Sequence, residues 1–227
     1  AKAGNIDQPY TKKQETNRKA IVLLTSNRGL AGGYNSNMVK MITQGDFNKE
    51  DLDIYAIGKK GREALERRGY IIKADYSELA DGFEYADAIK ISNQLVKSYE
   101  AGEIGEIYLA YTDFKNTVSH IPTVMKLLPI LPEDFIEEAG WMDDNLLMNF
   151  EPGDDEALKM IIPKYISSLI HGAMIEALAS ENGARMQAMD NATNNAEEMI
   201  SGLTLMYNRA RQGSITQELT EIIAGAE

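Results

Sequence analysis

The chain has 227 residues, a net charge of −12, and hydrophobic residues at 44% of its positions. That composition is typical of a folded globular protein, and the length suffices for one ordinary domain plus a substantial extension. The negative charge disfavours nucleic acid and anionic lipid surfaces as partners. The absence of cysteine excludes disulfides, thiolate zinc sites and a cysteine nucleophile. No run of the sequence approaches the ~18 apolar residues of a membrane-spanning helix, so we expect no membrane insertion.

Strand-length apolar runs alternate with helical segments through the first half of the chain. The predicted strands lie at 20–25, 52–57, 70–73 and 104–112, and the predicted helices between them at 36–44, 60–68 and 83–100. The resulting β-α-β-α-β-α-β order favours an α/β fold with a mostly parallel sheet and right-handed crossovers.

The pattern changes after residue 112. Residues 118–128 have no helical period and contain Pro122, which predicts a strand at an edge of the sheet. A polar loop follows, and residues 146–151 are predicted as a last short strand. We therefore expect a linker over 1–19, an α/β domain over 20–152 and a long helix over 153–227.

The long helix is expected to project well beyond the domain. Pro163 should kink it or divide off a short leading segment, and no proline follows. As a single helix, residues 154–227 would span about 110 Å at ~1.5 Å per residue. A domain of the preceding length would be only about 35–40 Å across.

A stripe of residues runs along this helix with a mean step of about 3.7 residues, close to the period of a straight helix. It begins at Ile162, Ile166 and Ile170 and ends at Met199, Leu203, Met206 and Ala210. Its middle is small throughout: Ala173, Ala177, Ser180, Ala184, Ala188, Ala192 and Ala196. Small side chains allow another backbone to approach closely, and a long isolated helix is only marginally stable in water. We therefore expect this middle part to pack against a neighbouring helix.

Several partners for the stripe are compatible with the sequence. A hairpin within the chain would need a second helix of similar length, and none is predicted in residues 1–150. The alternatives are a homodimeric coiled coil, a different partner chain, or a segment of this protein that precedes the given sequence. The chain opens on Ala-Lys-Ala-Gly without an initiator Met, which suggests a fragment.

The glycine-rich loop after the first strand is the best candidate for an enzyme site. Its Gly29, Gly32 and Gly33 match neither the dinucleotide-binding nor the P-loop pattern, and no lysine follows, although Arg28 is close. A tight strand-to-helix turn is favoured over a nucleotide site. The two histidines, His120 and His171, show no metal-ligand spacing, so the sequence predicts no catalytic constellation.

Three segments carry a family resemblance: residues 26–35, beginning Ser-Asn-Arg-Gly-Leu, residues 180–189, and residues 207–222. They resemble the signatures of the gamma subunit of F-type ATP synthase. The resemblance implies a Rossmann-like domain and a non-catalytic, cofactor-free central stalk. It also implies alpha, beta and epsilon subunits and a proton-driven c-subunit ring as partners. The place implied is the cytoplasmic face of a bacterial membrane.

The resemblance also assigns roles to particular residues. Arg211, Gln212 and Thr216 match family positions that touch the catch loop of a beta subunit, and Phe150 and Glu151 fall in a segment near the epsilon subunit and c ring. Family members begin with a long helix antiparallel to the C-terminal one, and this sequence has none before Pro9. We expect that helix to be the partner of the stripe, and the given chain to be a truncated subunit.

Two other classes of protein are also compatible with these sequence features. One is a nucleotide-dependent α/β enzyme with an oligomerising helix, which a titration with ATP, ADP or NAD would reveal. The other is a homodimeric scaffold protein, which light scattering would reveal.

Overall fold

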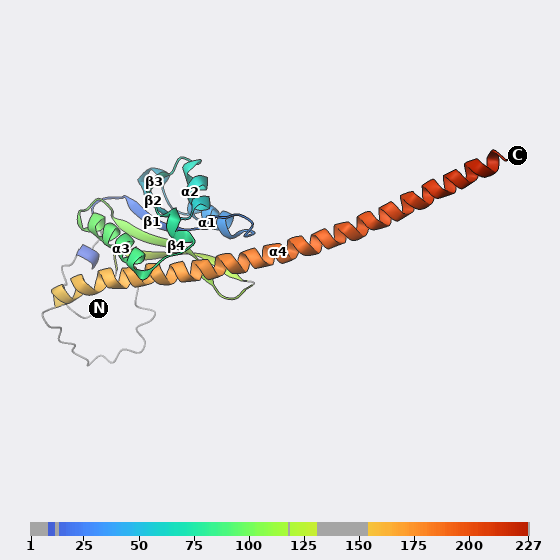
Figure 1. The fold of residues 1–227 in the computed structure, drawn as a ribbon. Coiled ribbons are helices and arrows are strands. Elements are labelled where there is room, and N and C mark those ends of the chain that lie inside the picture. The colour runs from blue at the N-terminus through green and yellow to red at the C-terminus, as the bar shows by residue number, and fades with distance from the viewer. Residues whose placement is uncertain (1–8, 12–13, 118, 131–153, 227) are drawn as a thin grey trace, which may run out of the picture.

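A five-stranded sheet and one very long helix dominate the computed structural model, which describes residues 9–11, 14–117, 119–130 and 154–226 (Figure 1). The strands are β1 (Lys19–Leu24), β2 (Leu52–Ile57), β3 (Ile71–Asp75), β4 (Glu106–Phe114) and β5 (His120–Leu128). The α-helices are α1 (Tyr34–Gln44), α2 (Lys59–Glu66), α3 (Tyr85–Glu100) and α4 (Asp154–Ala224). Three short 3-10 turns, Pro9–Thr11, Lys49–Asp51 and Ser77–Ala80, complete the described elements.

The sheet has the strand order β3-β2-β1-β4-β5. Its first four strands are parallel, which confirms the predicted mostly parallel α/β fold, and β5 runs antiparallel to β4 at one edge. Strand β1 lies in the centre because Ala20 to Leu24 are all apolar and can be buried on both faces. Pro122 lies in β5, which has no partner strand on its outer side within the described part of the chain, so the missing N–H group is tolerated there.

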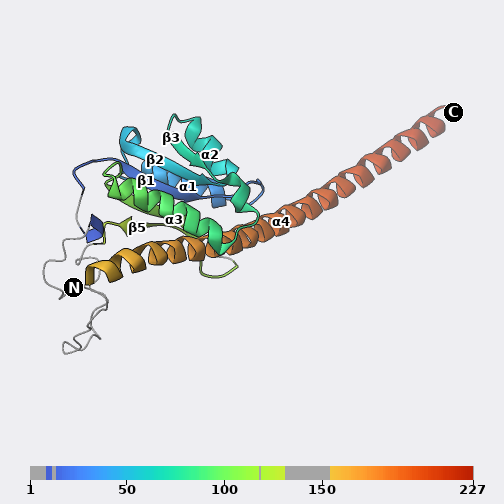
Figure 2. The ribbon, with the colours of Figure 1, turned by 60° about the vertical axis from the view of Figure 1, so that its left-hand side comes forward.

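Helices cover both faces of the sheet. One face packs against α1 and α2 through a cluster that includes Met38, Ile42 and Leu65. The other face packs against α3 and the first part of α4 through a larger cluster that includes Leu95 and Ile166. Figure 2 shows α3 lying alongside the beginning of α4, where the Ser92 hydroxyl donates to the Pro163 carbonyl at 3.1 Å.

Helix α4 has 71 residues and continues through Pro163 without a break. The expected division of the helix at this proline is therefore wrong. Pro163 lies near the start of the helix and removes only the hydrogen bond to the carbonyl of Lys159, a residue that is exposed to solvent. Water can therefore satisfy the freed carbonyl.

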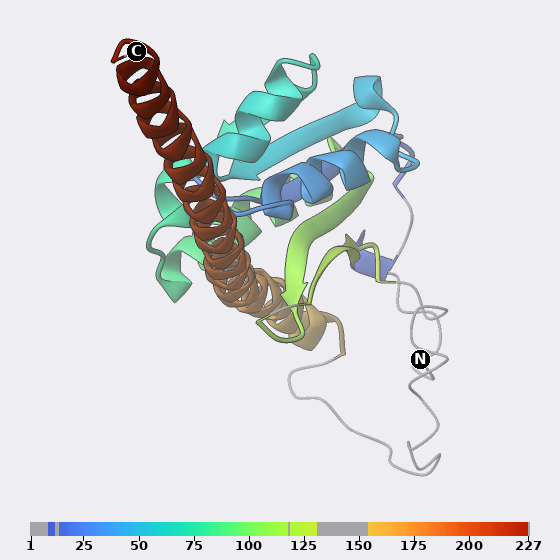
Figure 3. The same cartoon turned by 90° about the vertical axis from the view of Figure 1, so that its right-hand side faces the viewer.

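The first part of α4 is a layer of the domain, and the rest leaves it. Figure 3 looks nearly along the helix and shows its C-terminal end coming toward the viewer, away from the sheet. Every described residue from Met189 to Ala226 is exposed. The strand predicted at 146–151 lies outside the described residues.

Candidate functional site

The glycine-rich loop between β1 and α1 is closed by its own side chains. Asn35 accepts a hydrogen bond from the Ser26 amide at 2.9 Å and donates to the Ser26 hydroxyl at 2.7 Å. That hydroxyl donates in turn to the Arg28 carbonyl at 2.6 Å. Two loop residues have positive φ angles: Leu30 at 61° and Gly32 at 54°. These bonds satisfy the loop internally, as a structural strand-to-helix turn requires.

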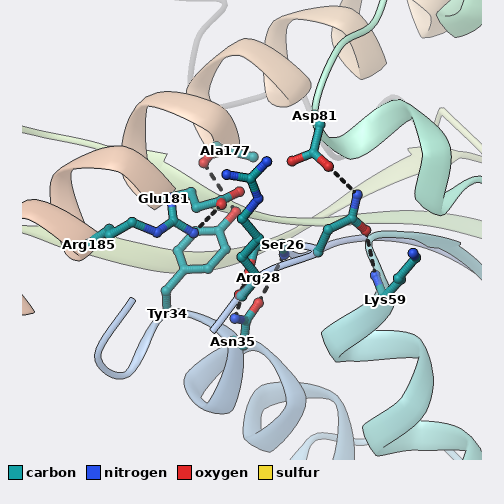
Figure 4. A network of polar contacts seen from close by, with 10 residues as sticks. Ser26, Arg28, Tyr34, Asn35, Lys59, Asp81, Ala177, Glu181 and Arg185 are labelled. Carbon is teal, nitrogen blue, oxygen red and sulfur yellow. Dashed lines mark hydrogen bonds and ion pairs between the residues drawn. The ribbon is translucent and has the colours of Figure 1, made fainter. Parts of the chain in front are cut away.

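The loop is also tied to its neighbours (Figure 4). The Asn27 amide group donates to Asp81 at 2.8 Å, and its carbonyl accepts from the Lys59 backbone N–H at 3.0 Å. The Tyr34 hydroxyl reaches α4 and donates to the Ala177 carbonyl at 3.1 Å. Burial of Tyr34 and the charge of nearby Glu181 raise the pKa of its hydroxyl above the usual value, so it stays a hydrogen-bond donor. The loop therefore fixes the position of α4 on the domain.

The two histidines are packed by aromatic rings. His171 on α4 meets Phe83 and Tyr85 edge to face, with ring centroids 5.6 and 5.4 Å away. His120 at the start of β5 lies 6.0 Å from Phe114. Among the described residues, no group of three or more His, Cys, Asp or Glu side chains is placed to hold a metal ion.

The stripe on α4 divides into two surfaces. Ala173, Ala177 and Ser180 are buried against the chain's own domain, and the Ser180 hydroxyl donates to the Thr112 carbonyl at 3.0 Å. Ala184 and Ala188 are half-buried, whereas Ala192 and Ala196 are exposed. A straight helix turns by 100° per residue, which places Ala196 about 140° around the axis from Ala173. The stripe thus leaves the domain-facing side, and only its later members stay available to a partner.

A second face of α4 was missed in the sequence. From Met160 to Tyr207, most exposed large apolar side chains fall on two positions of a seven-residue repeat. These are Ile161, Tyr165, Ile175, Met186, Met189, Ile200, Leu203 and Tyr207. The same two positions hold Gly172 and Ala196, and a Cβ at Gly172 would meet nothing within 4 Å. A repeat of three and four residues is the seam of a left-handed coiled coil. We call these residues the heptad seam; its first part, from Ile161 to Met186, lies on the side of α4 opposite the residues that pack on the domain.

Interruptions at the repeat positions hide this seam in the sequence. Polar or small residues such as Ser168, Asn182 and Thr193 interrupt it, and the buried stripe provides a competing apolar pattern on the same helix. In the folded structure the stripe is buried up to Ser180 and the seam beside it is exposed, which separates the two patterns there, whereas Ala196 and Leu203 belong to both.

The residues predicted to contact a beta subunit lie on the projecting part of α4, away from the loop. Arg211, Gln212 and Thr216 are exposed on the projecting part of α4, where the Thr216 hydroxyl donates to the Gln212 carbonyl at 2.9 Å. Phe150 and Glu151 lie outside the described residues. No described helix is both long and apolar enough to cross a bilayer.

Comparison with known proteins gives consistent matches. The family described as ATP synthase matches residues 1–227. An ATP synthase gamma chain from Lachnoclostridium phytofermentans is 61% identical over 229 residues, covering 99% of this chain and 79% of the relative. A relative from Acetobacterium woodii, described as an ATP synthase gamma chain, sodium ion specific, is 39% identical over 240 residues, covering 100% of this chain and 80% of the relative.

Solved structures share the fold. A chain in a cryo-EM structure of the Euglena gracilis mitochondrial ATP synthase matches with a TM-score of 0.66 and 18% identity, covering 99% of this chain and 80% of that one. A chain in the central stalk and c-ring structure from Tetrahymena thermophila matches with a TM-score of 0.59 and 23% identity, covering 82% of this chain and 83% of that one.

Proposed function

Because this chain belongs to the ATP synthase gamma-chain family, whose members are non-catalytic stalk subunits, we propose that it couples rotation to catalysis. In this role the turning of the c-subunit ring is transmitted through α4 to the alpha/beta catalytic hexamer. The catalytic sites belong to the beta subunits, so the chain needs no cofactor of its own.

The projecting half of α4 is the observation that carries the proposal. The 36 residues from Met189 to Ala224 are helical and exposed, which gives a shaft about 54 Å long at ~1.5 Å per residue. Large apolar side chains on this shaft, such as Leu203 at 62% and Met206 at 68%, are exposed to solvent. Large exposed apolar surfaces of this kind mark sites of interaction with another protein or segment.

The heptad seam supports a helical partner on one side of the shaft. We propose that this partner is the long N-terminal helix that gamma chains carry, packed antiparallel to α4. The small residues Gly172 and Ala196 would allow its backbone to approach closely. Burying a Leu or Ile side chain fully contributes about 1.5–3 kcal/mol, so a few seam residues such as Ile200 would hold the pair together.

The end of the shaft is proposed to meet a beta subunit. Arg211 and Gln212 provide charged and amide donors, and Thr216 lies one turn further along. Arginine is enriched among residues that dominate binding energy at interfaces. On the same reasoning from the family, Phe150 and Glu151 would lie near the epsilon subunit and c ring.

The coupling ion and the location complete the proposal. We propose proton coupling at the cytoplasmic face of a bacterial membrane, as the family resemblance implies; the relative described as sodium ion specific is only 39% identical to this chain. ATP synthesis in membrane vesicles should then collapse with a protonophore and be indifferent to added sodium. Dependence on sodium would refute the proton assignment and leave the stalk role untouched.

The rotor role is tested in a reconstituted complex with alpha and beta subunits. Arg211→Ala should weaken coupling between ATP hydrolysis and rotation, measured on single complexes with a bead attached to the domain. Arg209→Ala is the matched control, because two residues place its side chain about 200° around the same helix. Equal losses in both variants would contradict a directed contact at Arg211, and ATP hydrolysis by the complex without any rotation of the bead would refute the role itself.

A further inference from the structure

Two residue pairs in the chain have a sequence in which a side-chain carbonyl carbon can be attacked by the next main-chain nitrogen: Asp81–Gly82 and Asn182–Gly183. Glycine at the second position lacks the Cβ atom that otherwise hinders this ring closure. In an unconstrained chain the asparagine pair reacts faster, because an ionised carboxylate resists attack by a nucleophile. The sequence alone therefore ranks Asn182 as the more reactive residue.

The structure protects the asparagine pair. Asn182 and Gly183 lie inside α4, where the α-helical pattern bonds the Gly183 N–H to the carbonyl four residues earlier. Gly183 is also buried, and a Cβ atom there would be 2.6 Å from the His120 Nε2 atom. Ring closure at Asn182 would therefore require that α4 unwind in the part that packs on the domain.

The aspartate pair lies in a segment without regular structure, between the 3-10 turn Ser77–Ala80 and α3. Asp81 and Gly82 are both exposed, and the Gly82 N–H has no hydrogen-bond partner among the described residues. A Cβ atom added at Gly82 would meet nothing within 4 Å, so the surroundings leave room for the main chain to turn. The Gly82 nitrogen can therefore reach the Asp81 carboxyl without disrupting a helix or a strand.

Two features of the fold slow this reaction. The Asp81 carboxylate accepts a hydrogen bond from the Asn27 amide at 2.8 Å, which holds it toward the glycine-rich loop (Figure 4). The ψ angle of Asp81 is −12°, whereas ring closure needs the Gly82 nitrogen to swing to the side of Cβ. Breaking one exposed hydrogen bond and rotating one main-chain angle costs less than unwinding a packed helix.

We propose that Asp81–Gly82 is a site of spontaneous isoaspartate formation and that Asn27 restrains it. The Gly82 nitrogen attacks Cγ of the protonated Asp81 side chain. A C–N bond forms, and the amide proton and the acid hydroxyl leave as water. A second water opens the resulting succinimide: attack at the Asp81 main-chain carbonyl carbon gives isoaspartate, and attack at Cγ restores aspartate.

Isoaspartate loosens the glycine-rich loop from the segment that leads into α3. The main chain gains one methylene group at residue 81 and the carboxylate moves onto Cα, so the Asn27 Nδ2 group keeps only its bond to the Ser77 carbonyl at 2.9 Å. Phe83 follows two residues later and packs edge to face on His171 of α4. The modification therefore lies beside the contact between the domain and α4. It is independent of the proposed stalk role, so either can fail without the other.

The test is ageing of the full chain at physiological temperature and pH. Peptide mapping by mass spectrometry and labelling with an isoaspartate-specific carboxyl methyltransferase locate the product. In the native chain isoaspartate should accumulate at Asp81 while Asn182 stays unmodified, whereas in the urea-unfolded chain Asn182 should react first.

Three variants separate the contributions of glycine and of Asn27. Gly82→Ala should slow the reaction several-fold, because a methyl group hinders the attacking nitrogen. Gly202→Ala, at another glycine where a Cβ atom would meet nothing within 4 Å, is the matched control and should leave the rate unchanged. Asn27→Ala should speed the reaction about 2- to 12-fold, the factor expected for loss of one ordinary hydrogen bond.

Accumulation at Asp81 that Gly82→Ala suppresses and Gly202→Ala leaves unchanged supports the proposal. Modification of Asn182 before Asp81 in the native chain, or equal rates in Gly82→Ala and the unsubstituted chain, overturns it. An unchanged rate in Asn27→Ala overturns the restraint by Asn27. Amide hydrogen exchange of residues 77–90 should rise in the aged chain and not in aged Gly82→Ala, and the absence of such a rise overturns the loosening.

Discussion

Replacing Ile166 by alanine should loosen α4 from the domain. Ile166 is fully buried between α4 and the sheet, in the same cluster as Leu95 and Leu109. The substitution removes three carbon atoms, which at ~0.8 kcal/mol each gives about 2.4 kcal/mol of lost transfer free energy. The cavity left behind adds to this, so we expect a decrease of about 3–4 kcal/mol in the free energy of unfolding, within the usual range for such substitutions.

Urea unfolding followed by tyrosine fluorescence and circular dichroism measures this difference. The matched control is Ile200→Ala, the same chemical change on the same helix at a side chain that is 64% exposed. It should shift stability by less than about 0.5 kcal/mol. Alanine has the higher helix propensity, so the shift can even be favourable. If Ile166→Ala were as mild as Ile200→Ala, the first part of α4 would not be packed on the domain in solution.

Three further predictions follow from local geometry. Gly58→Ala should destabilise the domain severely, beyond about 3 kcal/mol by urea unfolding, because φ is +107° and a Cβ would lie 1.9 Å from the Thr25 carbonyl oxygen. Amide hydrogens of residues 189–224 should exchange much faster than those of residues 162–180, as mass spectrometry can measure, because a helix without packing is marginal. Burial alone would raise the pKa of Glu106, but hydrogen bonds and nearby lysine charges outweigh it and hold the pKa below the usual 4.5, so Glu106 stabilises the fold above that pH. This stability should be lost as pH falls through the lowered pKa, and thermal unfolding of Glu106→Gln should depend less on pH in that window.

The order of strands and helices was predictable from the sequence because it depends on local patterns of apolar residues and breaks. The apolar runs of β1 and β2 and the breaks at Gly69 and Pro122 are visible without any tertiary information. The first turn of α1 was not, since the helix was expected from Ser36 and begins at Tyr34. Glycine at position 33 serves as the N-cap there without a side-chain bond, so the sequence carries no capping signal.

The surfaces of α4 depend on tertiary packing. A single stripe was followed from Ile162 to Ala210 because apolar neighbours are nearly equivalent in sequence. The domain buries that stripe fully only up to Ser180 and half-covers Ala184 and Ala188, through contacts that no helical period encodes.

The contact between α4 and the domain is built to resist twisting of the helix. Small side chains let the helix backbone come close, so that hydroxyl groups bond directly to main-chain carbonyls. Ser92 and Tyr34 of the domain donate to the carbonyls of Pro163 and Ala177 on the helix, and Ser180 of the helix donates back to Thr112. These bonds are spread over nearly five helical turns, at 3.6 residues per turn, so rotation of α4 about its own axis would break all of them and expose Ile166. In the proposed rotor, the domain and the buried first part of α4 would therefore turn as one body, and twist under load would concentrate in the exposed part beyond Ala188.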